Sequence, residues 1–408
     1  MKNKGNERKT ILIVCEGTNT EPDYFSRLQK AMDIASKYHI TPEEKQQTSD
    51  YIIQLAKEDK SRFYHLKIES DKTIPKEKIE KNPHSSRTKN KTFESNDDKL
   101  FEELYGTFYN TKFKVIFDKK DAQPARYVKN AFLKEYQDCA YDELWAVFDK
   151  NGHTAHKEAY ELAQQKINEK AVNIAFSSRS FEYWILLHFE RINFTFEKSA
   201  CKEGKKEVNC GIENNLHQND CTKPNNQIKC IVGYIRKNTP LTKYAKSNKN
   251  EELNTLMTYL LDEKYLLSAF ENASWLRFQM NKLFPSTPIY ELNPYTNVDI
   301  LVKSILGVTK KYVWTELGHE ISIAGMGKVK VILNSSNQLE FIVKKINFNP
   351  HGTKIYLKNQ ERKITKLQVI ETFDMITESN KFTIQIPQLH EKQDFCIEFG
   401  NEILLIEL

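Results

Sequence analysis

The sequence has 408 residues, of which 39% are hydrophobic and 11% aromatic, enough for one large core or for two or three smaller ones. The net charge of +6 is the small difference between 61 basic and 55 acidic residues, so charge alone does not identify a nucleic-acid-binding protein. No stretch approaches about 18 apolar residues, and the charged N-terminus leads into a strand pattern rather than a signal peptide, so we expect a soluble cytoplasmic protein without membrane contact. Seven cysteines, an odd number, fit reduced thiols better than disulfides.

The first predicted unit is a strand followed by a helix. Residues 11–14 form a short apolar run rich in β-branched side chains, which is typical of a strand covered on both faces in a parallel sheet. Pro22 suits the first turn of a helix, and the apolar residues after it recur at helical spacing. Residues 37–110 break this pattern. We interpret them as an insertion, with predicted helices at 48–60 and 96–109 around a polar, lysine-rich centre.

Strands and helices alternate again after this insertion. Strands are predicted at 112–118, 143–149 and 172–177, and helices at 124–137 and 154–169. A further apolar helix follows the last of these strands and carries one acid near its start. Because four strands alternate with helices, we predict an α/β fold with an open, doubly wound and mostly parallel sheet. Ligands of such sheets bind beyond the carboxyl ends of the strands.

The rest of the chain divides into three segments of different composition. Residues 198–250 are rich in Lys, Asn, Cys and Thr and predict a basic, loop-rich insert. Helical patterns return at 251–283, and the sequence at 293–306 fits a capped closing helix. Short strand patterns separated by turn residues then continue to residue 408. We therefore predict an α/β domain over 1–307 and an all-β accessory domain over 308–408, a β-sandwich or β-barrel that serves in binding, oligomerisation or support of the α/β domain.

Four acidic residues fall where the predicted parallel strands end: Glu16, Glu21, Asp149 and Glu182. Two-metal sites for phosphoryl transfer need carboxylates from several chain segments at one sheet edge, and this placement suits them. Three of these acids also have a structural explanation. Glu16 and Glu182 lie near predicted helix N-termini, which favour negative charge, and Asp149 can begin an Asx turn. Both interpretations remain open from the residues alone.

Four motifs occur in order along the chain: ILIVCEGTNTEPDYF, DELWAVFDKNGH, IAFSSRSFEYWILLHFE and NPYTNVDILVKSIL. Together they resemble the RloB family of Toprim-domain proteins, which are found beside restriction-modification and abortive-infection loci. The resemblance covers most of residues 8–307 outside the two inserts. It implies a compact Toprim-like α/β fold in which a glutamate after the first strand and an Asp-x-Asp after a later strand bind Mg²⁺ for phosphodiester chemistry.

The resemblance also assigns individual residues. Glu16 matches the Toprim glutamate, and Asp149 matches the first aspartate of Asp-x-Asp. Similarity to nucleases of the overcoming-lysogenization-defect type implies that Glu21 is a further ligand. The same similarity matches Ser180 and Glu182 to a Ser-x-Glu element. The implied cofactor is Mg²⁺ or Mn²⁺.

Asn151 stands where the family pattern has its second aspartate. Its carbonyl oxygen can bind Mg²⁺ but contributes one negative charge less, which leaves open a weaker second ion or a site with one ion. His153 follows closely. Imidazole is a poor ligand for Mg²⁺, so we expect His153 to contact phosphate rather than metal.

The reaction that the resemblance implies is hydrolysis of a phosphodiester. Glu16, Asp149 and Glu182 would hold one or two ions that polarise the scissile phosphate, or Glu16 would act as the general base. Lys150 and Arg179 lie beside these acids in the sequence and can pair with phosphate or with developing charge. A solvated surface position is the alternative for Lys150.

Tyr234, Tyr244 and His188 are three further residues that could have a functional role. The lysine-rich inserts, with Tyr234 and Tyr244 nearby, could follow a nucleic-acid backbone or could form a solvated charged surface. His188 lies in an apolar helix and is expected to be a core histidine.

A group of cysteines lies in the basic insert. Their intervals lack the short C-x₂₋₄-C pairs of structural zinc sites, so we expect no zinc here. The group consists of Cys201, Cys210, Cys221 and Cys230, with His217 among them.

Three possible functions follow from these observations. The first is a Mg²⁺-dependent nuclease that cleaves RNA, such as tRNA, or DNA in anti-phage defence. Family context implies a separate ATPase partner, since the chain has no G-x-x-x-x-G-K-[ST] sequence. The second is a catalytically impaired regulatory subunit that binds nucleic acid or nucleotide, because Asn151 permits the loss of catalysis. A third alternative makes the chain an assembly subunit that works through 308–408, and a homo-oligomer is also open.

Overall fold

The computed structural model describes the α/β part of the chain most fully. The described residues are 10–16, 20–37, 65–70, 123–138, 140–150, 156–166, 169–200, 202–203, 206–207, 228–244, 256–257, 259–260, 263–308, 311–323, 327–333, 338–343, 354–359, 368–369, 381–385, 393–399 and 402–407. The predicted strand at 112–118 and the predicted helices at 48–60 and 96–109 lie outside them.

The centre of the α/β part is a five-stranded sheet in the order β2-β1-β3-β4-β7. Strands β2, β1, β3 and β4 run parallel, and the short β7 pairs antiparallel with β4. This confirms the predicted α/β class with a mostly parallel sheet, while the narrower Toprim-like fold stays a prediction. The strands are β1 (Thr10–Cys15), β2 (His65–Ser70), β3 (Glu143–Asp149), β4 (Val172–Ser178) and β7 (Tyr295–Thr296).

Strand β2 lies inside the segment that the sequence pattern assigns to an insertion, so excluding the whole of 37–110 from the sheet was wrong. It pairs in parallel with β1 along its full length, from His65 opposite Thr10 onward. In this strand Leu66 is buried whereas Lys67 is exposed. A strand at the end of the described sheet does not need apolar residues at every position, so no continuous apolar run marks it in the sequence.

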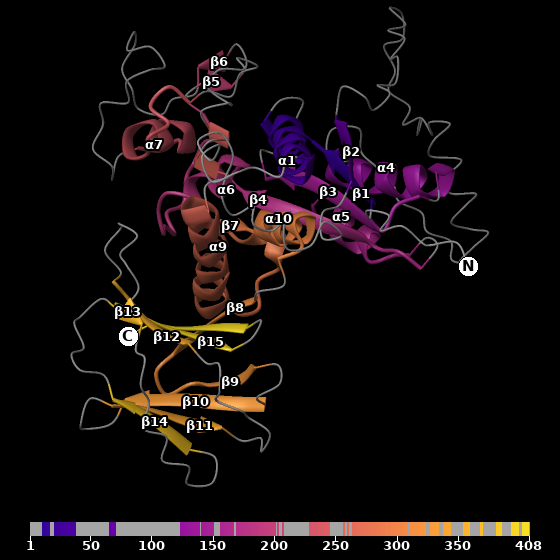
Figure 1. Cartoon of the computed structure of the whole chain (residues 1–408). Coiled ribbons are helices and arrows are strands. Elements are labelled where there is room, and N and C mark those ends of the chain that lie inside the picture. Colours follow the sequence, from indigo (N-terminus) through magenta and orange to yellow (C-terminus); the bar gives the residue numbers. More distant parts are fainter. Residues whose placement is uncertain are drawn as a thin grey trace, which may run out of the picture.

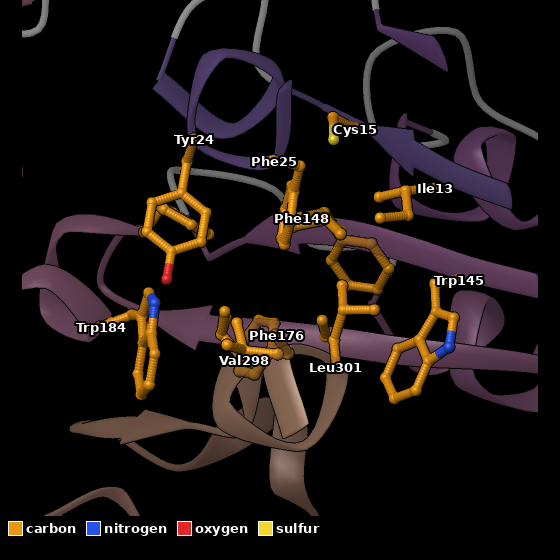
Figure 2. Packing of buried hydrophobic residues seen from close by; sticks show 14 of the residues in the cluster. Ile13, Cys15, Tyr24, Phe25, Trp145, Phe148, Phe176, Trp184, Val298 and Leu301 are labelled. Atoms are coloured by element: carbon orange, nitrogen blue, oxygen red, sulfur yellow. The ribbon is translucent and has the colours of Figure 1, made fainter. Parts of the chain in front are cut away.

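Helices cover the sheet, and their apolar side chains meet it in one core (Figure 1). Residues 11–15 of β1 are completely buried, as a strand between two layers requires. Figure 2 shows Tyr24 and Phe25 of α1 in the same cluster as Phe148 and Phe176 of the sheet. The predicted helix at 124–137 is confirmed, whereas the next helix is shorter than predicted. The helices are α1 (Thr20–Lys37), α4 (Gln123–Asp138), α5 (His156–Ala163), α6 (Glu182–Leu187) and α10 (Val298–Leu306).

Helices α7 (Ile231–Asn238) and α9 (Glu263–Leu283) follow α6 in the chain, and both contact it. The basic insert therefore contains at least one packed helix, together with the short strands β5 (Lys202–Glu203) and β6 (Lys206–Glu207). A single 3₁₀ turn, η4 (Ile289–Glu291), connects α9 to β7. None of the described helices combines the length and the apolar character needed to cross a membrane.

The strands after α10 form two sheets, which appear as two layers in Figure 1. One has the order β13-β12-β15-β16-β8, with only the β16–β8 pair parallel, and the other is the antiparallel sheet β14-β11-β10-β9. Trp314 of β8 donates a hydrogen bond of 2.9 Å from Nε1 to Ser274 Oγ of α9. The boundary at 308 and a separate all-β domain stay predictions. The strands are β8 (Lys311–Glu316), β9 (Glu320–Ile323), β10 (Gly327–Leu333), β11 (Gln338–Val343), β12 (Lys354–Asn359), β13 (Gln368–Val369), β14 (Lys381–Gln385), β15 (Gln393–Phe399) and β16 (Glu402–Glu407).

Candidate functional site

The carboxyl ends of β1, β3 and β4 form one edge of the sheet, because these strands are parallel neighbours. Glu16 directly follows β1, and Asp149 is the last residue of β3. Asp149 is opposite Ser177 in the β3–β4 register. The segment from Ser178 to Glu182 then connects β4 to α6. The topology therefore places Glu16 and Asp149 at one edge, where the segment that leads to Glu182 also begins.

Glu16 and Asp149 are in direct contact. The Glu16 backbone amide donates a hydrogen bond of 2.9 Å to the Val147 carbonyl, which fixes the residue beside β3. The Asp149 backbone amide donates to Glu16 Oε2 at 3.0 Å. Because a carboxylate has about four acceptor positions, this bond does not prevent Glu16 from binding a cation. Asp149 itself is only 6% exposed, whereas Glu16 is partly buried.

Glu21 and Glu182 form a second acidic group, each in the first turn of its helix. Tyr244 donates a hydrogen bond of 3.1 Å from its hydroxyl to Glu182 Oε1. Burial raises the pKa of the Tyr244 phenol well above its ordinary value, and the charges of Glu182 and Glu21 raise it further. Burial also raises the pKa of the Cys15 thiol, with Glu21 adding to the effect. The charge of Glu21 thus acts both on Cys15, at the end of β1, and on Tyr244.

The connection between β4 and α6 carries buried hydroxyl groups. Ser178 and Ser180 are both completely buried, and neither Oγ has a hydrogen-bond partner among the described residues. Most buried hydroxyls in proteins are hydrogen-bonded, so two neighbouring exceptions indicate a place for a ligand atom or water. Ser177, by contrast, is paired through its Oγ with Thr296 Oγ1 at 2.8 Å.

Two basic side chains lie at the same edge. Lys150 donates a hydrogen bond of 2.9 Å from Nζ to the Glu291 carbonyl. Burial lowers the pKa of Lys150, the Glu291 carboxylate raises it, and the positive charge of Arg179 lowers it again. The two cations are therefore close enough to influence each other. Arg179 Nε is buried and has no hydrogen-bond partner among the described residues. This pair can bind a phosphate group.

Two predicted site residues, Asn151 and His153, lie outside the described residues. In the part of the chain that the structure describes, no three His, Cys, Asp or Glu side chains gather closely enough to hold a metal ion by themselves. Mg²⁺ commonly binds through one or two carboxylates, with water and substrate phosphates as its other ligands. The contact between Glu16 and Asp149 fits that pattern better than a closed protein cage.

Comparison with known protein families gives a match over most of the chain. The family model described as RloB-like protein matches residues 11–305. The chain belongs to the RloB-like family. No curated protein and no solved structure matches it.

Two tyrosines of this RloB-like protein are buried, although they belong to its basic insert. The sequence left open whether the inserts near Tyr234 and Tyr244 follow a nucleic-acid backbone or form a solvated charged surface. Both tyrosines are only 1% and 2% exposed, and both donate hydrogen bonds to buried glutamates. A buried phenol cannot stack on a base, so the two tyrosines themselves do not form such a surface, while nucleic-acid binding by the inserts stays a prediction. The basic residues around the two tyrosines gave no indication that they are buried against glutamates, because a long-range hydrogen bond leaves no local pattern in the sequence.

Asn297 of the RloB-like protein has a positioning role that the sequence motif did not reveal. Its side-chain oxygen accepts a hydrogen bond of 2.6 Å from the Phe176 amide, and its Nδ2 donates to the Ile174 carbonyl at 2.9 Å. The side chain therefore pairs with β4 as a further strand would. This holds the start of α10 against the strand that leads to the candidate site.

Cys230 caps helix α7, where its sulfur accepts a hydrogen bond from the Gly233 amide at 3.3 Å. Its thiol is buried and is not part of a disulfide between described residues. The other residues of the predicted cysteine group, Cys201, Cys210, Cys221 and His217, lie outside the described residues.

His188 is a buried core residue, as predicted. It is 1% exposed, with Nδ1 3.0 Å from the Trp184 carbonyl and its ring centroid 4.5 Å from that of Trp184. Burial lowers the pKa of its imidazole to about 3. The ring is therefore neutral at physiological pH.

The substitution His188→Phe is expected to make the free energy of unfolding less dependent on pH. The pKa of about 3 in the folded protein is below the ordinary value of 6.5, so the unfolded chain binds a proton that the folded chain does not bind as the pH falls below 6.5. The wild type should lose about 2.5 kcal/mol between about pH 7 and about pH 4.5 through this group alone. Urea titrations at both pH values measure the difference, and identical pH dependence in wild type and variant would contradict it.

Proposed function

We propose that this RloB-like protein is a Mg²⁺- or Mn²⁺-dependent nuclease that cleaves RNA, tRNA included, or DNA in anti-phage defence. The observation that carries the proposal is the hydrogen bond between the Asp149 amide and the Glu16 carboxylate at the carboxyl ends of neighbouring parallel strands. These two residues are also the ones that match the Toprim metal ligands by motif. Ligands of open α/β sheets bind at such an edge.

The side chains near this edge fit a hard divalent cation. Glu16, Asp149, Glu21, Glu182 and Ser180 offer only oxygen atoms, which Mg²⁺ and Mn²⁺ prefer. Glu16 and Asp149 would hold one ion, with Asn151 as a third protein ligand, and the second acidic group would support another. When bound, the ion polarises the phosphate and lowers the pKa of a water molecule.

The two basic residues near this edge would supply positive charge for binding the phosphate. Lys150 and Arg179 would bind the non-bridging oxygens of the phosphate, where the Lys150–Glu291 hydrogen bond holds the ammonium group in place. Glu16 binds the ion or takes the proton of the attacking water. In this proposal a separate ATPase provides energy or detects infection, since the chain has no P-loop sequence.

The proposal is tested by incubating the purified chain with total RNA and, separately, with plasmid DNA, in Mg²⁺, in Mn²⁺ and in EDTA. We expect fragments of one nucleic acid with either metal and none with EDTA. The nucleic acid that is cut identifies the substrate class. Intact RNA and DNA under every condition would contradict a nuclease.

A second candidate function is a regulatory subunit that binds nucleic acid or nucleotide without cleaving it. The observation that favours it is Asn151, which removes one carboxylate from the family pattern. Binding that persists in EDTA, without cleavage under any divalent ion, would support this function instead. Gel-shift and cleavage measurements on the same samples separate the two functions.

A further inference from the structure

Two tyrosines of segment 228–244 form hydrogen bonds near the two ends of helix α6. Tyr244 donates to Glu182 Oε1 at 3.1 Å, at the start of α6. Tyr234 donates to Glu190 Oε2 at 3.0 Å, just beyond its end. All four side chains are less than 9% exposed. A buried carboxylate requires hydrogen-bond partners, and these hydroxyls each provide one.

The backbone holds the Tyr244 phenol in a defined position. Its amide donates to the Leu241 carbonyl at 3.0 Å, and its carbonyl accepts a hydrogen bond from Arg236 Nε at 2.5 Å. Arg236 lies in α7, whose first turn is capped by Cys230. The hydroxyl of Tyr244 is thus directed at Glu182 by a packed helix rather than by a free loop.

The two glutamates have different surroundings. Glu182 lies beside Ser180 and, through Tyr244, near Glu21, both of which match the family's metal-binding pattern. Glu190 follows the C-terminal end of α6, opposite to the end at which Glu182 lies, and does not match the family's metal-binding pattern. The same tyrosine–glutamate contact therefore occurs twice, once at the candidate metal site and once outside it.

We propose that Tyr244 is a positioning residue of the candidate metal site, which orients the Glu182 carboxylate for a divalent cation. The basic insert would then complete the site instead of only covering it. This inference rests on the proposed function, since it assumes that Glu182 binds a metal ion. Residues that hold a metal ligand in place typically contribute 10- to 100-fold to metal affinity.

The test is a titration with Mn²⁺ alone, followed by the electron paramagnetic resonance signal of the free ion. Tyr244→Phe removes only the hydroxyl, and Tyr234→Phe removes the matched hydroxyl at Glu190. We expect Tyr244→Phe to raise the Kd for Mn²⁺ by about 10- to 100-fold and Tyr234→Phe to leave it unchanged. Both variants should lose a similar amount of thermal stability, because each leaves one buried carboxylate with one donor fewer.

A double variant distinguishes positioning from a general loss of structure. If Tyr244 acts through Glu182, adding Tyr244→Phe to Glu182→Gln should not weaken Mn²⁺ binding further. A wild-type affinity in Tyr244→Phe, or equal weakening in both tyrosine variants, would overturn the inference. In either case a loss of Mn²⁺ binding in Asp149→Ala would leave the proposed function intact. A wild type that binds no Mn²⁺ would overturn both.

Discussion

Replacing Glu16 with glutamine or Asp149 with asparagine is expected to reduce metal-dependent cleavage of nucleic acid by about 10³-fold or more. Each substitution removes one negative charge from the carboxyl edge of the sheet, where the cation is proposed to bind. Loss of an ion's contribution of several kcal/mol to the transition state corresponds to a rate effect of this size. The rate is measured with the substrate that the purified wild type cleaves.

Glu16→Gln is the more informative of the two substitutions. The glutamine side chain retains a carbonyl oxygen that can accept the hydrogen bond from the Asp149 amide, so the junction of β1 and β3 should keep its structure. Glu158→Gln is a matched control, because Glu158 is exposed in the first turn of α5. Circular dichroism should show the same fold in all variants. Cleavage at the wild-type rate by both site variants would contradict the assignment of the site.

Replacing Asp299 with asparagine is expected to destabilise the α/β part by about 3–5 kcal/mol. Asp299 is completely buried and accepts hydrogen bonds from both terminal nitrogens of Arg277, at 2.5 and 2.9 Å, while Lys303 Nζ lies 3.4 Å away. Asparagine would leave two largely buried cations without their carboxylate. Urea unfolding followed by tryptophan fluorescence measures the loss.

The position of this ion pair explains why its effect should reach the site. Arg277 of α9 also donates to the Thr296 carbonyl at 2.9 Å, and Thr296 pairs with Ser177 at the end of β4.

The control for Asp299→Asn is Glu161→Gln, since the exposed Lys157–Glu161 pair at 3.8 Å should contribute less than about 1 kcal/mol to stability. A cost for Asp299→Asn as small as that of the control would contradict the prediction.

The Asp299 contribution should also depend on pH in a defined direction. Burial alone would raise the pKa of Asp299, but Arg277 and Lys303 outweigh it and hold the pKa below the ordinary value of 3.8. The folded form therefore gains stability that is complete above that value and is lost as the pH falls through the lower pKa of the folded protein. Asp299→Asn should remove this acid-sensitive part of the unfolding curve.

The strands that flank the candidate site could be predicted because they are buried on both faces. Residues 11–14, 143–149 and 172–177 carry almost uninterrupted apolar runs, and a sheet between two layers of helices requires them. Once these strands were expected to be parallel, the acids that follow them had to meet at one edge. Strand β2 gave no such signal, because a half-exposed strand alternates polar and apolar residues over only six positions.

The burial and hydrogen bonding of individual side chains near that edge depend on contacts between segments that are distant in the sequence. Tyr244 and Glu182 are separated by 62 residues, and the polar sequence around Tyr244 predicts exposure. Asn297 likewise bonds to a strand 121 residues earlier. Neither contact follows from periodicity, which records only the local face of a helix or strand.

By itself, the sequence determined the α/β class, the family and the acidic residues that reach the carboxyl edge, because apolar periodicity and motif order are local properties of the chain. Only the tertiary structure decided that Glu16 touches Asp149, that Tyr244 is buried against Glu182, and that β2 joins the sheet. The physical reason is that each of these is a pairing between segments far apart in the chain. Such pairings depend on how whole helices and strands pack. A buried polar group needs a hydrogen-bond partner, and packing decides which distant residue lies close enough to be that partner.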